Sequence, residues 1–218
     1  MKKNMSKVFF EILNENEKEV LLSLKPYFEK QGILAGGTSL MLQIPVRKSY
    51  DFDLFFPYEI PDIFLRSASI LFKSDIRVLI NNSDELTFVA RKEIKISFIY
   101  FPFPRKYETV IKDQVSLSSF KDIASDKAYA IGRRPEYRDY VDLFIILKDG
   151  FKIEQTILDA REKFGGEFSE KLFLSQLVYF EDIKDFSVDF IKESHTTQEI
   201  KYFFKKEVHK LQSGIVPQ

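Results

Sequence analysis

Residues 36–53 read GGTSLMLQIPVRKSYDFD: a glycine pair with a hydroxyl residue, a spacer of helix length, and two carboxylates at positions 51 and 53. The aromatic and aliphatic run around these carboxylates, which continues to residue 56, favours a β-strand. Because strand side chains alternate between faces, Asp51 and Asp53 share one face, and Phe52 and Leu54 share the other. Two carboxylates in this arrangement can hold one divalent cation, and their hard oxygens suit Mg²⁺ that carries nucleotide phosphates.

The glycine turn supplies complementary chemistry. Gly36 and Gly37 permit a close backbone approach that a side chain would block. After a short strand at 32–35, Thr38 is predicted to cap a helix over 39–43, whose unpaired amides would face an anion. Glycine pairs before helices and Asp-x-Asp on a solvated strand are also common without any function. A purely structural interpretation of the stretch therefore stays open at this point.

Patterns along the chain change near residue 118. The expected strands are 77–80, 86–91, 94–101 and one or two within 110–117, and the expected helices before residue 118 lie within 9–31 and at 63–73. From there on the pattern is helical, at 119–131, 138–147, 153–164, 167–182 and 197–211. The sequence thus predicts an α+β fold with two packed domains, a mixed α/β half at 1–118 and a helical half at 119–218, with a cleft between them.

Composition limits the chemistry. The 218 residues are 44% hydrophobic with 23 phenylalanines, which indicates a globular protein, and 33 basic residues balance 33 acidic ones. Since the chain has no cysteine, disulfides, thiolate catalysis and cysteine-ligated zinc are excluded, and His195 and His209 are too few for most histidine-based sites. No apolar run approaches the roughly 20 residues that span a bilayer. We expect a cytoplasmic protein that makes no use of a membrane.

The helical half contains two further motifs. Asp122 precedes Lys127 by about one and a half helical turns, and a lysine over a cleft can neutralise triphosphate charge. Asp139 and Asp142 lie three residues apart and so share a helix face, where they can orient Lys127 or touch a substrate hydroxyl. The structural alternatives are a capping box at Asp122, a solvated lysine, and an Arg138–Asp142 surface pair.

Together these segments resemble the AbiEii/AbiGii nucleotidyltransferase family, known from bacterial abortive-infection and toxin-antitoxin systems. Its first signature matches GGT at 36–38 followed by RKSYDFD at 47–53. An Asp followed a turn later by Lys matches Asp122 and Lys127, and Arg-Asp-x-x-Asp matches RDYVD at 138–142. Three motifs in order over roughly residues 30–150 are far more specific than any one of them.

The resemblance implies a polymerase-β-like nucleotidyltransferase core with a mixed sheet, followed by a helical-bundle subdomain. Such an enzyme transfers a nucleoside monophosphate from an NTP to an acceptor hydroxyl on a tRNA-like RNA or on protein, and acts as a toxin with an antitoxin partner. Mg²⁺ would be held by Asp51 and Asp53. The implied nucleotide-binding residues are Gly36, Gly37, Thr38, Arg47, Ser49 and Lys127, and the implied catalytic residues are Asp51, Asp53, Lys127, Asp139 and Asp142.

One position departs from the family. Where the family often has Lys-x-Asp on a later strand, this chain has Lys95-Ile96-Ser97, and serine is neither a strong metal ligand nor a general base. Glu93 would lie about 13 Å from position 97, too far to replace it. Either Asp139 or Asp142 takes over, or the protein is a catalytically impaired nucleotide-binding or partner-binding protein of the same fold.

The acceptor is not defined by the sequence. Five cationic residues could line a basic groove that binds an RNA phosphate backbone, or they could be dispersed surface charge. They are Lys95, Arg105, Lys106, Arg133 and Arg134.

Overall fold

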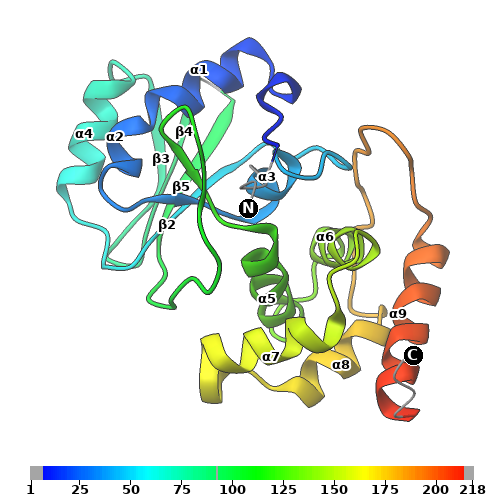
Figure 1. Cartoon of the computed structure of the whole chain (residues 1–218). Coiled ribbons are helices and arrows are strands. Elements are labelled where there is room, and N and C mark those ends of the chain that lie inside the picture. The colour runs from blue at the N-terminus through cyan, green and yellow to red at the C-terminus, as the bar shows by residue number, and fades with distance from the viewer. Residues whose placement is uncertain (1–6, 92, 214–218) are drawn as a thin grey trace, which may run out of the picture. The chain divides into compact units, whose positions relative to one another are not determined.

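The structure is a computed structural model that describes residues 7–91 and 93–213. The chain divides into two compact units, Met1–Ser119 and Phe120–Gln218, coloured blue to green and green to red in Figure 1. The division into two domains at residue 118 stays a prediction, because compactness does not by itself establish independent folding.

The first unit is built on a seven-stranded sheet in the order β3-β4-β5-β2-β1-β7-β6. β2 runs parallel to β5 and β1 parallel to β7, and the other neighbours are antiparallel. The strands are β1 (Ile33–Leu34), β2 (Phe52–Phe56), β3 (Ile76–Asn81), β4 (Glu85–Ala90), β5 (Ile94–Tyr100), β6 (Val110–Lys112) and β7 (Val115–Leu117). The predicted α+β class with a mixed sheet is confirmed.

One face of this sheet forms the core of the first unit. Phe56 and Phe98 point from β2 and β5 toward the helices, where they contact the rings of Tyr27 and Phe64. These large side chains are almost completely buried. These phenylalanines therefore fill a core, and the side chains at alternate positions of β2 and β5 are directed to the opposite face.

The helices of the first unit follow local sequence signals. Its elements are η1 (Phe10–Ile12), α1 (Glu15–Ser23), α2 (Lys25–Phe28), α3 (Gly36–Met41) and α4 (Ile63–Leu71). The segment 9–31 becomes two helices, since a capping box between Asn14 and Glu17 starts α1, and Pro26 occupies the first turn of α2. Figure 1 shows α1, α2 and α4 together on one side of the sheet.

The second unit is helical in the part that the structure describes. It contains α5 (Phe120–Ile131), α6 (Tyr137–Lys148), α7 (Ile153–Phe164), η2 (Gly165–Glu167), α8 (Glu170–Val178) and α9 (Thr197–Ser213). The prediction of one helix over 167–182 was too long. Ser169 caps α8 by accepting a hydrogen bond from the amide of Leu172, so the helix starts at Glu170 and ends before Tyr179 turns extended.

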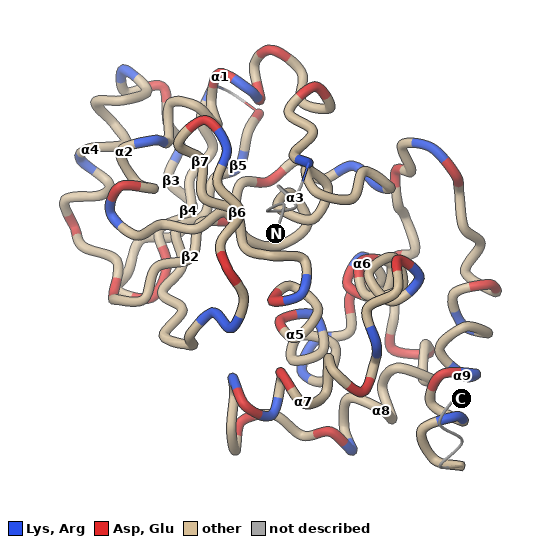
Figure 2. The backbone as a smooth tube through the Cα atoms, in the orientation of Figure 1, with Lys and Arg blue, Asp and Glu red and all other residues tan. Residues whose placement is uncertain are grey.

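Charges of both signs are interspersed along the tube in both units, as Figure 2 shows. This agrees with the equal numbers of basic and acidic residues in the sequence. Among the described residues, no helix has the length and apolar character required to cross a membrane.

Candidate active site

The two carboxylates of the opening stretch lie at the start of β2. Phe52 and Leu54 are buried while Asp53 between them is half-buried, so the predicted alternation of faces is confirmed. Asp51 directly precedes the strand, and its Oδ2 lies 2.9 Å from Nζ of Lys95 on β5. Both partners of this ion pair are roughly two-fifths exposed, so the pair is weak and open to exchange with solvent ions.

The parallel pairing of β2 with β5 places Ser97 directly beside Asp53. Thr87 of β4 is paired to Ser97 from the other side, and both hydroxyl residues are buried. Within residues 7–91 and 93–213, no three Asp, Glu or His side chains gather closely enough to hold a metal ion. The donors on this sheet are therefore two carboxylates next to a hydroxyl, a set that fits one hard divalent cation whose other ligands are water and phosphate.

The glycine turn packs directly against Asp53. Gly36 has a φ of +62°, a left-handed conformation that other residues adopt only with strain. A Cβ at this position would stand 3.1 Å from Asp53 Oδ2. The amide of Ala35 also donates a hydrogen bond of 2.8 Å to the carbonyl of Asp53. The turn and the carboxylate thus form one local structure, in which a side chain at position 36 would displace the acid.

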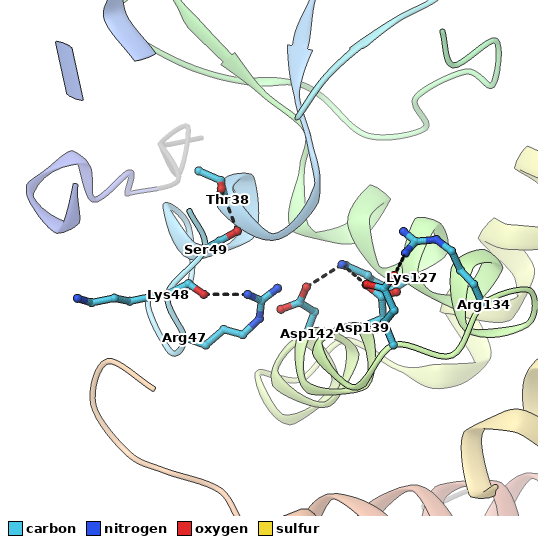
Figure 3. Close-up of polar contacts among 9 residues, drawn as sticks. Thr38, Arg47, Lys48, Ser49, Lys127, Arg134, Asp139 and Asp142 are labelled. Atoms are coloured by element: carbon cyan, nitrogen blue, oxygen red, sulfur yellow. Dashed lines mark hydrogen bonds and ion pairs between the residues drawn. The ribbon is translucent and has the colours of Figure 1, made fainter. Parts of the chain in front are cut away.

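Gly37 is approached by the protein's own side chains. A Cβ there would lie 2.5 Å from an Nη of Arg47 and 2.9 Å from Oγ of Ser49. Arg47 is buried, at 6% exposure, and its other Nη donates to the carbonyl of Lys48 over 2.9 Å, as Figure 3 shows. The glycine therefore makes room for a buried guanidinium and a hydroxyl next to α3.

Thr38 does not cap a helix over 39–43, and that prediction was wrong. The helix begins earlier, at Gly36, with Ala35 in the capping position. The Thr38 hydroxyl instead donates to the carbonyl of Asp51 and lies 3.0 Å from Oγ of Ser49. Thr38 thereby ties α3 to the loop that leads into β2 and fixes where the carboxylates begin.

In the second unit, Lys127 of α5 is held by two acids of α6. Its Nζ lies 2.5 Å from Asp139 Oδ1 and 2.8 Å from Asp142 Oδ2, and Figure 3 shows the ammonium between the two carboxylates. The side chains are 12%, 6% and 1% exposed, respectively. The alternative of a surface pair between Arg138 and Asp142 is wrong because Asp142 is completely buried.

Asp122 belongs to a second buried ion cluster, which the sequence did not predict. Nζ of Lys163 on α7 lies 2.6 Å from Asp126 and 3.4 Å from Asp122, with only 3% of the lysine side chain exposed. Lys163 comes about forty positions after these acids. No local spacing signals such a contact, since it depends on how α7 packs against α5.

The cations of the predicted basic groove differ in their contacts with other side chains. Arg133 pairs with Glu167 at 3.2 Å, and Arg134 pairs with Glu136. Arg105 donates to Oγ of Ser118 over 3.1 Å. The two ion pairs reduce the charge that Arg133 and Arg134 offer to a phosphate backbone, whereas the hydrogen bond to a neutral hydroxyl leaves the charge of Arg105 unchanged.

A mixed sheet that carries Asp-x-Asp beside a glycine turn, in a chain with a helical second half, defines a nucleotidyltransferase-type protein. Residues 20–214 match the family model described as nucleotidyl transferase AbiEii toxin, type IV toxin-antitoxin system. The chain belongs to this AbiEii family and is therefore a toxin-type nucleotidyltransferase.

The chain is also similar to individual proteins. The uncharacterized protein aq_aa25 of Aquifex aeolicus strain VF5 is 34% identical over 181 residues, which is 80% of this chain and 85% of that protein. The solved structure of MenT4, a nucleotidyltransferase toxin of Mycobacterium tuberculosis H37Rv, has a TM-score of 0.58 at 14% identity and covers 91% of this chain and 86% of that one. A solved structure from H. pylori has a TM-score of 0.51 at 16% identity, covering 94% of this chain and 100% of that one. At these identities the two structures support the fold.

Proposed function

We propose that this protein transfers a nucleoside monophosphate from an NTP to an acceptor hydroxyl, with pyrophosphate as the leaving group. The observation that carries the proposal is the packing of the Gly36 turn against Asp53. The backbone of a glycine turn and a carboxylate pair suited to a cation therefore lie next to each other.

In this proposal Asp51 and Asp53 hold Mg²⁺, which supplies positive charge to the NTP phosphates during transfer. The backbone at Gly36 and Gly37 lies against the phosphates, and Thr38, which is bound to the Asp51 carbonyl, keeps the turn in place. Arg47 and Ser49 support that turn from the side through their packing on Gly37.

Lys127 is proposed to contact the triphosphate, and its two acids hold the ammonium in position. Asp139 is the better candidate to accept the proton of the acceptor hydroxyl. Its Oδ1 makes the ion pair with Lys127, and its Oδ2 has no hydrogen-bond partner in the described part of the chain. The acceptor oxygen would bond to the α-phosphorus, the bond from that phosphorus to the leaving pyrophosphate would break, and the carboxylate would take the proton.

The second candidate is a nucleotide-binding protein with impaired catalysis. Ser97 favours it, because the register places a hydroxyl beside Asp53 where a third carboxylate would strengthen metal binding. Such a protein would bind Mg-NTP and give no product on any acceptor.

The acceptor and partners are likewise proposals. The AbiEii family description implies action as the toxin of a type IV toxin-antitoxin pair. We propose an RNA or protein acceptor in the cytoplasm, where NTPs are abundant, and an antitoxin that opposes the toxin's effect.

The experiment incubates the purified chain with total cellular RNA and protein, Mg²⁺, and each α-labelled NTP in turn. A labelled product is expected from the wild type, and none from Asp53→Asn. The matched control is Asp62→Asn, which removes an exposed acid beside α4. If Mg-NTP binds by calorimetry and no acceptor becomes labelled, the impaired-binding alternative replaces the proposal.

A further inference from the structure

A groove of about 540 Å³ lies where β2 and β5 end in the first unit. Its lining is mainly aromatic and proline-rich, with residues from α2, β1, β2, β6, β7 and the loop after β5. Figure 1 shows that loop, residues 101–109, extending beyond the ends of β2 and β5. Among the described lining residues, Arg105 is the one charged side chain.

Part of the groove lining lies on the same sheet face as the proposed metal pair, while Phe28 and Phe56 line the groove from the face that the helices cover. Phe55 follows Asp53 by two positions on β2, so both side chains are on one face, separated along the strand by about 7 Å. Ile33 is paired to Phe55 from β1, which extends this face across the neighbouring strand. On the other side, Ser97 is paired to Asp53 and Ile99 to Phe55. A continuous surface therefore leads from the carboxylates to the groove.

Aromatic rings and a guanidinium form one wall of the groove. Phe55 and Phe101 are stacked, with centroids 4.6 Å apart and 25° between their planes. Phe103 meets Phe101 edge to face at 5.1 Å. The Arg105 guanidinium carbon lies 5.3 Å from the Phe55 centroid and 4.8 Å from that of Phe101, and Ser118 fixes the guanidinium by a hydrogen bond. All three rings are half-buried, so part of each is exposed to the groove.

We propose that this groove binds a base of a single-stranded RNA acceptor. A nucleobase can pack on half-exposed phenylalanine rings whatever its identity, and a neighbouring phosphate complements a guanidinium in a lining without carboxylates. The proposed function needs an acceptor hydroxyl near Asp53. The separation of about 7 Å between Asp53 and Phe55 corresponds to one or two nucleotides along an RNA strand. The inference rests on the proposed function, since it assigns RNA as the acceptor class.

Binding of RNA without any NTP tests the groove separately from catalysis. The probe is a six-nucleotide oligoadenylate with a 5′ fluorophore, measured by anisotropy with the full-length chain at low salt. An oligomer of the same length and charge that lacks all bases serves as the comparison for stacking. Phe101→Leu keeps apolar volume and removes the aromatic ring, and Arg105→Gln removes the charge. The matched controls are Arg66→Gln and Tyr202→Leu, which change exposed side chains outside the groove.

We expect Phe101→Leu to weaken oligoadenylate binding by about tenfold and to leave the weaker binding of the baseless oligomer unchanged. Arg105→Gln should weaken the binding of both oligomers and reduce its salt dependence. The proposal is overturned if the wild type does not distinguish the two oligomers, or if Phe101→Leu binds oligoadenylate as the wild type does.

The two proposals fail in different ways. Asp53→Asn should retain full oligoadenylate binding while it loses nucleotidyl transfer. If transfer survives this substitution, the proposed catalytic role fails, and the groove is still judged by the binding measurements. If binding does not depend on the groove and transfer depends on Asp53, the groove assignment alone fails.

Discussion

Lys127→Met should destabilise the second unit strongly. The substitution keeps the length of the side chain and removes the ammonium that lies within 3 Å of two carboxylates. Because Asp139 and Asp142 are 6% and 1% exposed, water cannot replace the lost partner. Removing one member of a buried ion pair costs about 3–5 kcal/mol, which is a large part of the roughly 5–15 kcal/mol that stabilises a typical domain.

The assay is urea unfolding followed by far-ultraviolet circular dichroism, which reports mainly on helices. The double variant Lys127→Met/Asp142→Asn should recover part of the loss, because one of the two uncompensated charges is removed with the lysine. Lys121→Met, on the same helix, is the comparison for loss of a lysine as such. A loss below about 1 kcal/mol in Lys127→Met, or no recovery in the double variant, would show that the three groups are solvated and not coupled.

Three smaller perturbations test other parts of the structure. Gly37→Ala should lower the free energy of unfolding by about 1–3 kcal/mol and impair nucleotide binding, because its Cβ would stand 2.5 Å from the buried Arg47. Unchanged urea unfolding and unchanged nucleotide affinity would contradict this prediction. Lys95→Met should change stability by less than about 1 kcal/mol and lower the Mg²⁺ concentration for half-maximal transfer, because the ammonium lies 2.9 Å from Asp51 and would compete with Mg²⁺ for this carboxylate. A higher Mg²⁺ requirement in the variant would contradict this competition. Burial raises the pKa of Tyr140, so the contribution of its neutral form to stability is complete below the ordinary tyrosine pKa of about 10 and is lost as the pH rises further. Urea titrations above pH 10 should therefore show a smaller fall in stability for Tyr140→Phe than for the wild type.

The sequence predicted the strands well because their signals are local. β2 to β5 lie within about one residue of the expected ranges, since alternating apolar side chains and a turn at 81–84 define them without help from the rest of the fold. The strand order was not predictable in the same way. The parallel pairing that places Ser97 beside Asp53 depends on a crossover through α4, β3 and β4, which no local pattern encodes.

Side-chain contacts in the site were likewise predictable where the signal was local in sequence, and not where the contact depends on the tertiary structure. The spacing of Asp139 and Asp142 predicted a shared helix face, and both reach Lys127. The capping role predicted for Thr38 was wrong, because tertiary hydrogen bonds to the loop before β2 compete with local capping. Lys163 gave no signal at all, since its acids are distant in sequence.

The central claim is that the β2 carboxylates support metal-dependent nucleotidyl transfer, and pyrophosphate release tests it most directly. Wild type and Asp53→Asn are compared at matched concentrations with an NTP, total cellular RNA and protein as the acceptor source, and a titration of Mg²⁺, after circular dichroism has shown equal folding. The account predicts Mg²⁺-dependent release from the wild type, and a loss of at least a hundredfold in Asp53→Asn, about 2.7 kcal/mol of transition-state stabilisation. Equal release by the two proteins, or release by the wild type that persists in excess chelator, would contradict it.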